Sequence, residues 1–301
     1  MALSVYWTIN ALILLAIAVS AILWARLLHG VVRQKRSWAE VLPVRPRPRP
    51  FWTPADFLVM FGTFAVLVQL FPRLLMDQGW IQPTSDDPEA VVSLESRIAA
   101  VTAMIAAGLG ALTITLTWLR LCNRDAWRLL GLLPTKQDIV LGLRGAVMIL
   151  PPVLLISFAA SYFVPYEHQV LDELASSPHP ALFVAIFAAT AIVTPIVEEF
   201  TFRVLLQGGL QGMVDRNIDA EGNWRPESHW PVVATSLLFA VMHYNQGAAQ
   251  VPLFFMSLGL GYLYRQSGKL APPVLVHLGL NATTLCVLFA ELQSGAVAGQ
   301  P

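Results

Sequence analysis

The apolar residues of this chain are gathered in blocks that have the length of a membrane-crossing helix. A helix needs about 20 mostly apolar residues to cross the hydrocarbon core of a bilayer, because each residue adds about 1.5 Å. Eight apolar blocks follow one another, at residues 5–24, 51–71, 98–118, 139–163, 181–197, 231–242, 251–264 and 272–290. The sixth and seventh are short, as helices shielded inside a bundle can be. The sequence therefore predicts an all-α fold, a polytopic integral membrane bundle of about eight transmembrane helices.

Composition and charge exclude several other classes of protein. Hydrophobic residues make up 56% of the chain and charged residues only 13%, whereas soluble domains have about 25% charged residues. Nineteen Lys and Arg balance nineteen Asp and Glu, so the chain has no basic face for nucleic acid. We therefore expect a lipid bilayer as its surroundings, and neither a disordered chain nor a nucleic-acid partner.

The positions of the basic residues predict how the helices are oriented. When eight spans alternate from an N-terminus outside, the inner loops contain sixteen Lys and Arg and the outer loops only Arg73 and Arg97. Cytoplasmic loops of membrane proteins carry such an excess of positive charge. The sequence thus predicts a multi-pass protein of the cell membrane with both termini outside.

Three clusters of polar residues lie in consecutive late blocks, where ionisable groups are costly and need a reason. They are Glu198, Glu199 and Arg203 in the fifth block, Phe239 and His243 in the sixth, and His277 and Asn281 in the eighth. Residues four apart share one face of a helix, so Glu199 can pair with Arg203. Glu198 lies about 100° around the helix from Glu199, so its side chain points in a different direction. The other two clusters are each a pair of residues four positions apart.

The positions of these residues along their blocks predict one shared site. Glu198 follows a long apolar run, His277 lies shortly after the start of its block, and His243 ends the sixth block. At the helical rise these depths allow the three side chains to meet in the cytoplasmic half of the bilayer. We expect a cavity that is open to the cytoplasm and supplies water.

A carboxylate, two imidazoles and an amide around one water suit the hydrolysis of an amide bond. The glutamate can act as general base, and the imidazoles and the amide can orient the water and stabilise an oxyanion. Alternatively, Glu198, His243 and His277 bind a divalent metal such as zinc, which lowers the pKa of its bound water. The sequence contains no His-Glu-x-x-His motif, which argues against a conventional zinc protease.

Each of these features has an ordinary explanation when it is taken alone. A buried histidine often bonds two helices together, Glu199 and Arg203 can be a simple ion pair, and Asn281 can join two helices. Ser257 and Gly261 have the spacing of a helix-packing face. The functional interpretation depends on the polar clusters occurring together in consecutive spans.

The ordered motifs Glu-Glu-x-x-x-Arg, Phe-x-x-x-His and His-x-x-x-Asn resemble those of the CPBP family, the CAAX prenyl protease and bacteriocin-processing (Abi) intramembrane proteases. The residues between Gly259 and His277 and the segment Leu130-Gly-Leu-Leu-Pro134 are similar to the family as well. The resemblance extends over about half of the chain, from Leu130 to Glu291.

This resemblance implies an intramembrane endopeptidase that cuts a membrane-associated peptide or protein, prenylated or bacteriocin-like. It implies that Glu198 activates water together with His243, and that His277 and Asn281 position the water and stabilise the oxyanion. Glu199 and Arg203 complete the first motif, and Phe239 begins the second. The family leaves open whether a metal takes part.

The resemblance also divides the chain into three parts. Residues 1–129 form an N-terminal region of about three spans, with a basic linker that contains the segment Arg45-Pro-Arg-Pro-Arg-Pro50. Residues 130–291 form the catalytic domain, and residues 292–301 a C-terminal tail. Two other functions stay open. One is a non-proteolytic scaffold or immunity protein, and the other is a proton-coupled transporter, which the sequence favours less because its two halves lack the matching interrupted helices of an inverted repeat.

Overall fold

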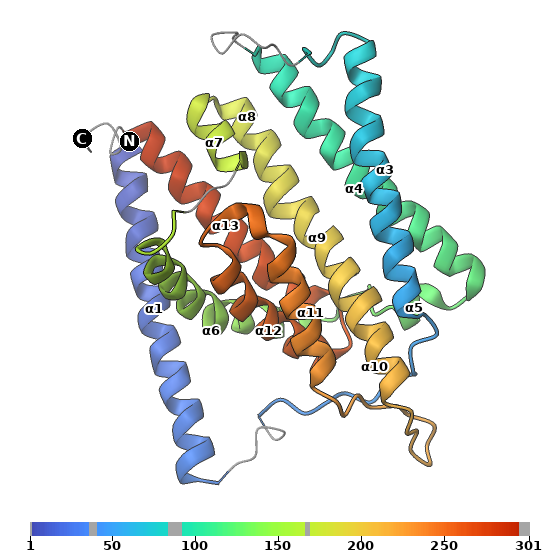
Figure 1. The fold of residues 1–301 in the computed structure, drawn as a ribbon. Helices are drawn as coiled ribbons and strands as arrows, with labels where there is room; N and C mark the ends of the chain where they lie inside the picture. Colours follow the sequence, from blue (N-terminus) through green and yellow to red (C-terminus); the bar gives the residue numbers. More distant parts are fainter. Residues whose placement is uncertain (1, 36–40, 84–91, 166–168, 295–301) are drawn as a thin grey trace.

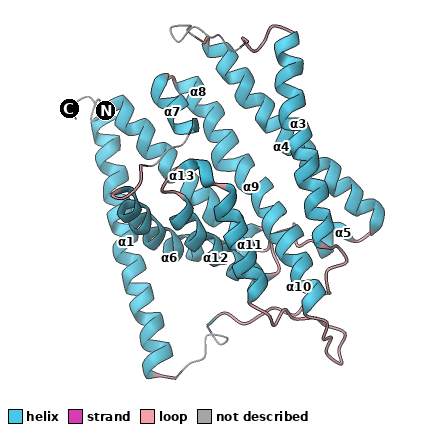
Figure 2. Cartoon of the chain, viewed as in Figure 1, coloured by secondary structure: helices cyan, strands magenta, loops and turns pink. Residues whose placement is uncertain are grey.

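The computed structural model describes residues 2–35, 41–83, 92–165 and 169–294, and most of these are helical (Figures 1 and 2). In chain order, the helices are α1 (Ala2–Arg33), α3 (Pro54–Asp77), α4 (Leu94–Cys122), α5 (Ala126–Leu129), α6 (Lys136–Ser161), α7 (Gln169–Ser176), α8 (Pro180–Ile186), η1 (Phe187–Val193), α9 (Thr194–Glu199), η2 (Phe200–Gln207), α10 (Gly208–Val214), α11 (Trp230–Met242), η3 (Tyr244–Gln246), α12 (Gln250–Ser267) and α13 (Ala271–Ser294). Within the described ranges, β-pairing is limited to isolated bridges at the Trp224 backbone. The predicted all-α fold is confirmed.

In the described ranges, six helices are long and apolar enough to cross a membrane: α1, α3, α4, α6, the continuous helix from Pro180 to Val214, and α13. The two remaining blocks also fold as helices, α11 with 13 residues and α12 with 18 residues. α12 is largely buried in its second half, so neighbouring helices shield it from lipid. The polytopic helical bundle is confirmed, and a count of eight crossings stays a prediction.

The fifth predicted block ends too early. The structure continues this helix from Pro180 to Val214, through two π-helical stretches, η1 and η2. The polar residues at 198–203 suggested a boundary, but the helix continues because all of their side chains except that of Glu198 are buried against other helices. The first π stretch ends at Val193, two residues before Pro195, which has no backbone N–H to donate to the preceding turn.

The start of α1 and the end of α13 lie at the same end of the bundle, which we call the terminal end (Figure 1). The opposite end, which we call the basic end, holds the loops that join α1 to α3, α4 to α6, α10 to α11, and α12 to α13. Hydrogen bonds join these loops, including Arg45 N–H to Gln266 O (2.8 Å) and Leu270 N–H to Gly131 O (3.2 Å).

Arg47 fixes the Pro/Arg segment (residues 42–50) to the basic end. Its guanidinium lies 5.3 Å from the ring of Trp224 and 5.8 Å from the ring of Tyr264, and it donates to the carbonyl oxygen of Arg265 (3.0 Å). Burial lowers the pKa of Arg47 to about 10. The segment is thus built into the fold, as an anchor would be.

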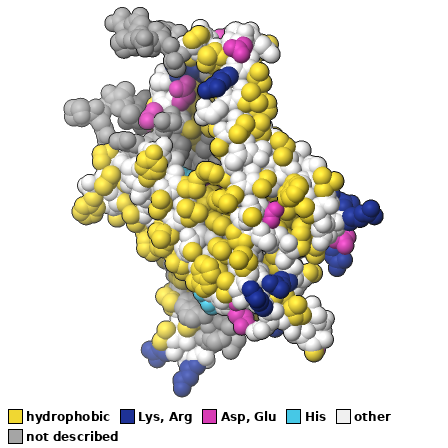
Figure 3. All heavy atoms as spheres, turned by 45° about the vertical axis from the view of Figure 1, so that its right-hand side comes forward, with side chains coloured by type: hydrophobic (Ala, Val, Ile, Leu, Met, Phe, Trp, Pro, Cys, Tyr) yellow, Lys and Arg dark blue, Asp and Glu magenta, His cyan; other side chains and the backbone are white. Residues whose placement is uncertain are grey.

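The side of the bundle that α3 and α4 form is mostly apolar. In Figure 3, Lys, Arg, Asp and Glu side chains gather mainly toward the ends of the molecule, and hydrophobic side chains cover much of the surface between them. Exposed residues such as Leu58, Val66 and Ile114 belong to this surface. Such a band matches the hydrocarbon core of a bilayer.

α3 and α4 also pack against the helix that carries the predicted site. The ring of Phe57 contacts that of Phe202 (5.7 Å, edge to face), and the indole N–H of Trp52 donates to Val204 O (2.7 Å). α3 and α4 therefore share one hydrophobic core with the later helices.

Candidate active site

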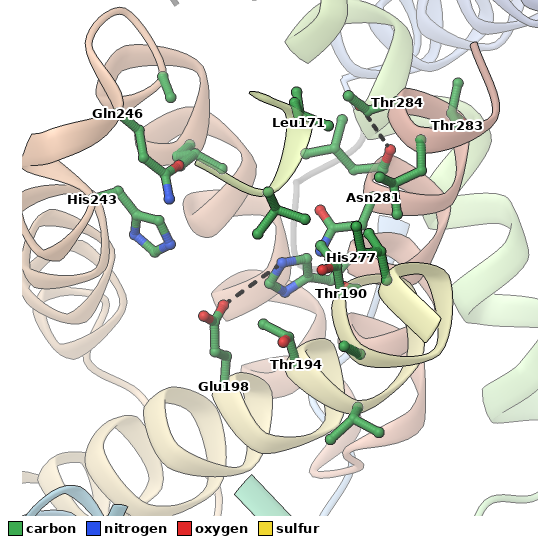
Figure 4. Close-up of a pocket in the computed structure, with 18 of the residues that line it drawn as sticks. Leu171, Thr190, Thr194, Glu198, His243, Gln246, His277, Asn281, Thr283 and Thr284 are labelled. Carbon is green, nitrogen blue, oxygen red and sulfur yellow. Dashed lines mark hydrogen bonds and ion pairs between the residues drawn. The ribbon is translucent and has the colours of Figure 1, made fainter. Parts of the chain in front are cut away.

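A cavity of about 770 Å³ lies between α3, α4, α6, α7, the continuous helix α8–α10, α12 and α13. Most of its lining is apolar. Its polar lining includes the four residues that the sequence names as catalytic, which come from three separate parts of the chain (Figure 4): Glu198, His243, His277 and Asn281. The fold thus brings these side chains to one cavity.

The two adjacent glutamates point in different directions. Glu198 lines the cavity and its side chain is 26% exposed, whereas the side chain of Glu199 is completely buried. Glu199 accepts a hydrogen bond from Nε of Arg203 at 2.8 Å. The predicted pairing four residues apart is therefore present, and it leaves Glu198 without a cation from its own helix.

Glu199 also fixes the orientation of His277. Nδ1 of His277 donates to Oε1 of Glu199 at 2.9 Å, because a carboxylate paired with an arginine can only accept. Arg203 is held in turn by Ser257, whose Oγ accepts from Nη2 at 2.8 Å. Every side chain in this series is buried, so the ring of His277 is locked by a continuous set of charged hydrogen bonds.

The locked ring turns its second nitrogen toward Glu198. Nε2 of His277 lies 3.7 Å from Oε2 of Glu198 (Figure 4). This separation is longer than a hydrogen bond, and polar groups at such distances are commonly bridged by water. The geometry therefore suits a water molecule held between a carboxylate and an imidazole.

His243 faces the same space from the C-terminal end of α11 (Figure 4). Its Nδ1 donates to the carbonyl oxygen of Phe239 at 2.7 Å, which leaves Nε2 as the acceptor in the neutral ring. The ring of Phe239 contacts both imidazoles, with centroids 4.6 Å from His243 and 5.9 Å from His277. Phe239 thus acts as a buried spacer between the two histidines.

Asn281 lies one turn after His277 on α13. One of its amide hydrogens is donated to the carbonyl oxygen of Thr190, at 2.8 Å. Thr190 belongs to the π-helical stretch η1. The second amide hydrogen of Asn281 is left for the cavity that this side chain lines.

A buried polar stripe extends from the site toward the basic end. Glu199, Arg203, Gln207 and Gln211 are spaced four apart and are all completely buried. In a regular α-helix each such step drifts by about 40°, and the wider turn of η2 counteracts this drift. Gln207 donates to the carbonyl oxygen of Gly261 (2.8 Å).

Ser257 and Gly261 were expected to be a packing face, and their role toward the polar stripe was missed. Both accept hydrogen bonds from it, through the hydroxyl of Ser257 and the carbonyl of Gly261. Their spacing of four matches the period of the stripe, which is the signal that could have revealed the pairing. Thr190 gave no signal, because it contributes only a backbone oxygen.

The predicted zinc ligands do not form a cluster with metal-binding geometry. Within the described part of the chain, no three His, Cys, Asp or Glu side chains are grouped so that they could hold a metal ion. A catalytic zinc needs three protein ligands. The described residues show no such group around Glu198, His243 and His277, and a metal at these side chains stays a prediction.

The depth of the site differs from the expectation in one respect. Glu198 lies near the middle of the continuous helix Pro180–Val214, rather than at the end of a shorter span. From there the cavity extends toward the terminal end, because its lining includes Ser161 and Glu291 near the last turns of α6 and α13.

Comparisons with known proteins give one match. Residues 180–283, about a third of the chain, match the family model described as type II CAAX prenyl endopeptidase Rce1-like. No curated protein and no solved structure matches. The matched residues contain all three polar motifs, and the family indicates a membrane-embedded peptidase, a hydrolase of peptide bonds. Residues 180–283 are therefore an Rce1-like type II CAAX prenyl endopeptidase domain, the family that the motifs predicted.

Proposed function

We propose that this protein is an intramembrane endopeptidase in which Glu198 activates the attacking water. The observation that carries this proposal is the placement of His277. Its Nδ1 is committed to Glu199, and its Nε2 lies 3.7 Å from the carboxylate of Glu198, within the cavity. A carboxylate base and a locked imidazole that both face the cavity can bind the same water from its side, and amide hydrolysis uses these groups.

The first step is addition of water to the peptide carbonyl. Glu198 takes one proton from the water, and the water oxygen forms a bond to the carbonyl carbon. The carbonyl oxygen becomes an oxyanion. Nε2–H of a protonated His277 and the second amide hydrogen of Asn281 would donate to it, and such donors are worth about 10²–10³-fold in rate.

The second step breaks the carbon–nitrogen bond. The proton held by Glu198 passes to the leaving nitrogen, either directly or through Nε2 of His243, and the products are a carboxylic acid and an amine. His243 suits this transfer because its Nδ1–H is held by the carbonyl of Phe239, which leaves Nε2 free to accept and return a proton.

The substrate that the cavity favours is a peptide with an apolar portion. The lining around the polar site consists mainly of aliphatic and aromatic side chains, such as Met60, Phe64, Met104 and Leu253. These residues can hold an apolar segment or a lipid-modified residue while Glu198 faces a peptide bond.

A comparison of membrane-protein termini tests the proposal. Cells that express wild-type protein should contain new peptide termini that are absent with Glu198→Gln, which keeps the size of the side chain but not its base. Glu95→Gln is the matched control, because Glu95 is an exposed glutamate on α4. If the Glu198→Gln cells contain the same new termini, this role of Glu198 is ruled out. If no terminus depends on the presence of the protein, the result favours a non-proteolytic scaffold.

A further inference from the structure

The active-site cavity has a direction along the bundle. On the continuous helix α8–α10, its lining extends from Phe202 back to Ile186, and on α13 from His277 forward to Glu291. Because these helices run in opposite directions, both sets extend from the site toward the terminal end (Figure 1). Ser161, in the last turn of α6, belongs to the same lining. The catalytic residues thus lie at one end of the cavity, and the other end, which we call the mouth, lies toward the terminal end.

α7 lies at this mouth. Val170 and Leu171 of α7 line the cavity, and Leu174 is completely buried. Glu173, in the same helix, pairs with Arg97 of α4 at 2.6 Å. A short amphipathic helix therefore forms one wall of the opening, with its charged face directed away from the cavity.

The basic end is closed by protein. The Pro/Arg segment passes beneath the bundle, where Arg45 pairs with the buried carboxylate of Asp138, and Arg49 donates to Gly212 O at 2.9 Å. Residues 215–229 pack beside this segment around Trp224, which is 1% exposed. None of the cavity-lining residues comes from these two segments.

The two ends also differ in charge. Among the described residues, the terminal end has two basic side chains, Arg73 and Arg97, and the acidic side chains of Asp77, Glu95, Asp172, Glu173 and Glu291. The basic end has most of the Lys and Arg of the described chain, among them Arg33, Arg45, Arg47, Arg49, Arg120, Arg124, Arg128, Lys136, Arg216, Arg225 and Lys269. By the positive-inside rule, the basic end faces the cytoplasm.

From the cavity direction and this charge asymmetry together, we propose that the active site opens on the non-cytoplasmic side of the membrane. The substrate is then a polypeptide whose cleavage site reaches the cavity from the outer surface or from the outer half of the bilayer. The statement about the substrate rests on the proposed peptidase function. The proposed orientation replaces the expectation of a cavity open to the cytoplasm. The orientation itself is independent of catalysis.

This orientation selects a class of substrate. A soluble cytoplasmic chain cannot reach Glu198 from its own side, because the Pro/Arg segment and residues 215–229 lie in the way. A segment that has been translocated, or an apolar segment inserted in the membrane, can reach the mouth between α6, α7 and α13. The reaction that supplies the substrate must therefore be a translocation or membrane-insertion step.

Sided cysteine labelling of the full-length protein tests the orientation. The natural Cys122 is exposed and ends α4 at the basic end, so the variant Cys286→Ser leaves a reporter there. In a background of Cys122→Ser and Cys286→Ser, Ser161→Cys reports on the cavity mouth. Gln78→Cys, at an exposed position next to α3, reports on the terminal end outside the cavity.

The reagent is a membrane-impermeant maleimide, applied to right-side-out and inside-out vesicles. We expect Ser161→Cys and Gln78→Cys to react at least tenfold faster in right-side-out vesicles, and Cys122 to react at least tenfold faster in inside-out vesicles. The reverse pattern, or equal labelling from both sides, overturns the proposal. Labelling of Gln78→Cys without Ser161→Cys in right-side-out vesicles also overturns it, because the mouth would then not open there.

The same labelling in the Glu198→Gln background separates this proposal from the proposed function. The labelling pattern needs no proteolysis and should be unchanged in that background. If the pattern holds but Glu198→Gln still cleaves, the catalytic assignment fails while the orientation stands. If Glu198→Gln is inactive but the pattern is reversed, the orientation fails and the catalytic assignment stands.

Discussion

Glu199 and His277, which are 78 residues apart in the sequence, are joined by a buried hydrogen bond of 2.9 Å. This bond connects the helix that carries Glu198 to the helix that carries Asn281. It also decides which nitrogen of His277 faces the cavity. The motif glutamate that does not line the cavity is thus the residue that orients the site.

Glu199→Gln should therefore lower turnover although the residue does not line the cavity. The amide keeps an acceptor for Nδ1 of His277 but loses the charge that holds both His277 and Arg203. A small misplacement of a catalytic group can cost about 10²-fold in rate. We expect kcat to fall by about this factor with KM changed much less, as measured with reconstituted protein. If KM rises by a factor similar to the fall in kcat, Glu199 contacts the substrate instead.

Arg203→Ala should destabilise the fold. Arg203 is completely buried, pairs with Glu199 and donates to Ser257. Removal of one partner from a buried ion pair costs about 3–5 kcal/mol, because the remaining charge stays buried without compensation. The midpoint of thermal unfolding in detergent should fall strongly, whereas Arg225→Ala, at an exposed position, should leave it unchanged. Equal midpoints for Arg203→Ala and wild type would contradict the buried pairing.

Gly261→Ala tests the crossing between α12 and the polar stripe. A Cβ at this position would lie 2.8 Å from Oε1 of Gln207 and 2.8 Å from a methyl group of Val232. Overpacking of this kind costs about 1–3 kcal/mol. Gly62→Ala is the control, because a Cβ at Gly62 meets no atom within 4 Å. The prediction is wrong if both variants unfold at the wild-type temperature.

The part of the site that depends on spacing along one helix could be predicted from the sequence. The spacing predicted that Glu199 shares a helix face with Arg203 and that Glu198 does not. The structure confirms both, because Glu199 pairs with Arg203 and Glu198 lines the cavity. The bond from Glu199 to His277 could not be predicted, because it depends on how two distant helices cross. The role of Ser257 was missed for the same reason.

The fold shows the same division between local and long-range information. The apolar blocks predicted where the helices lie, because the apolar side chains of each block must either be buried in protein or face the lipid. The continuation of α8 to Val214 was missed, because a run of polar residues ends an apolar pattern even when tertiary partners bury it. The sequence pattern also does not specify which helices line the cavity, since this depends on the packing of α6, α7 and α13 together.

Chelation should leave cleavage unchanged. The described side chains offer Glu198 and His277 near one point, with no third ligand grouped with them, and a catalytic zinc needs three protein ligands. Activity before and after treatment with 1,10-phenanthroline and metal content by mass spectrometry check this expectation. Loss of activity that added zinc restores, together with one zinc per chain, would contradict it.

The most direct test of the central claim is the cleavage rate of purified, reconstituted protein on a substrate identified by its Glu198-dependent terminus. A general base contributes about 10²–10⁴-fold to such a reaction. We expect Glu198→Gln to lower kcat at least about 100-fold, the lower end of this range. Glu95→Gln should keep the wild-type rate, and both variants should unfold at the wild-type temperature. A wild-type rate with Glu198→Gln would contradict the assignment of Glu198 as the residue that activates water.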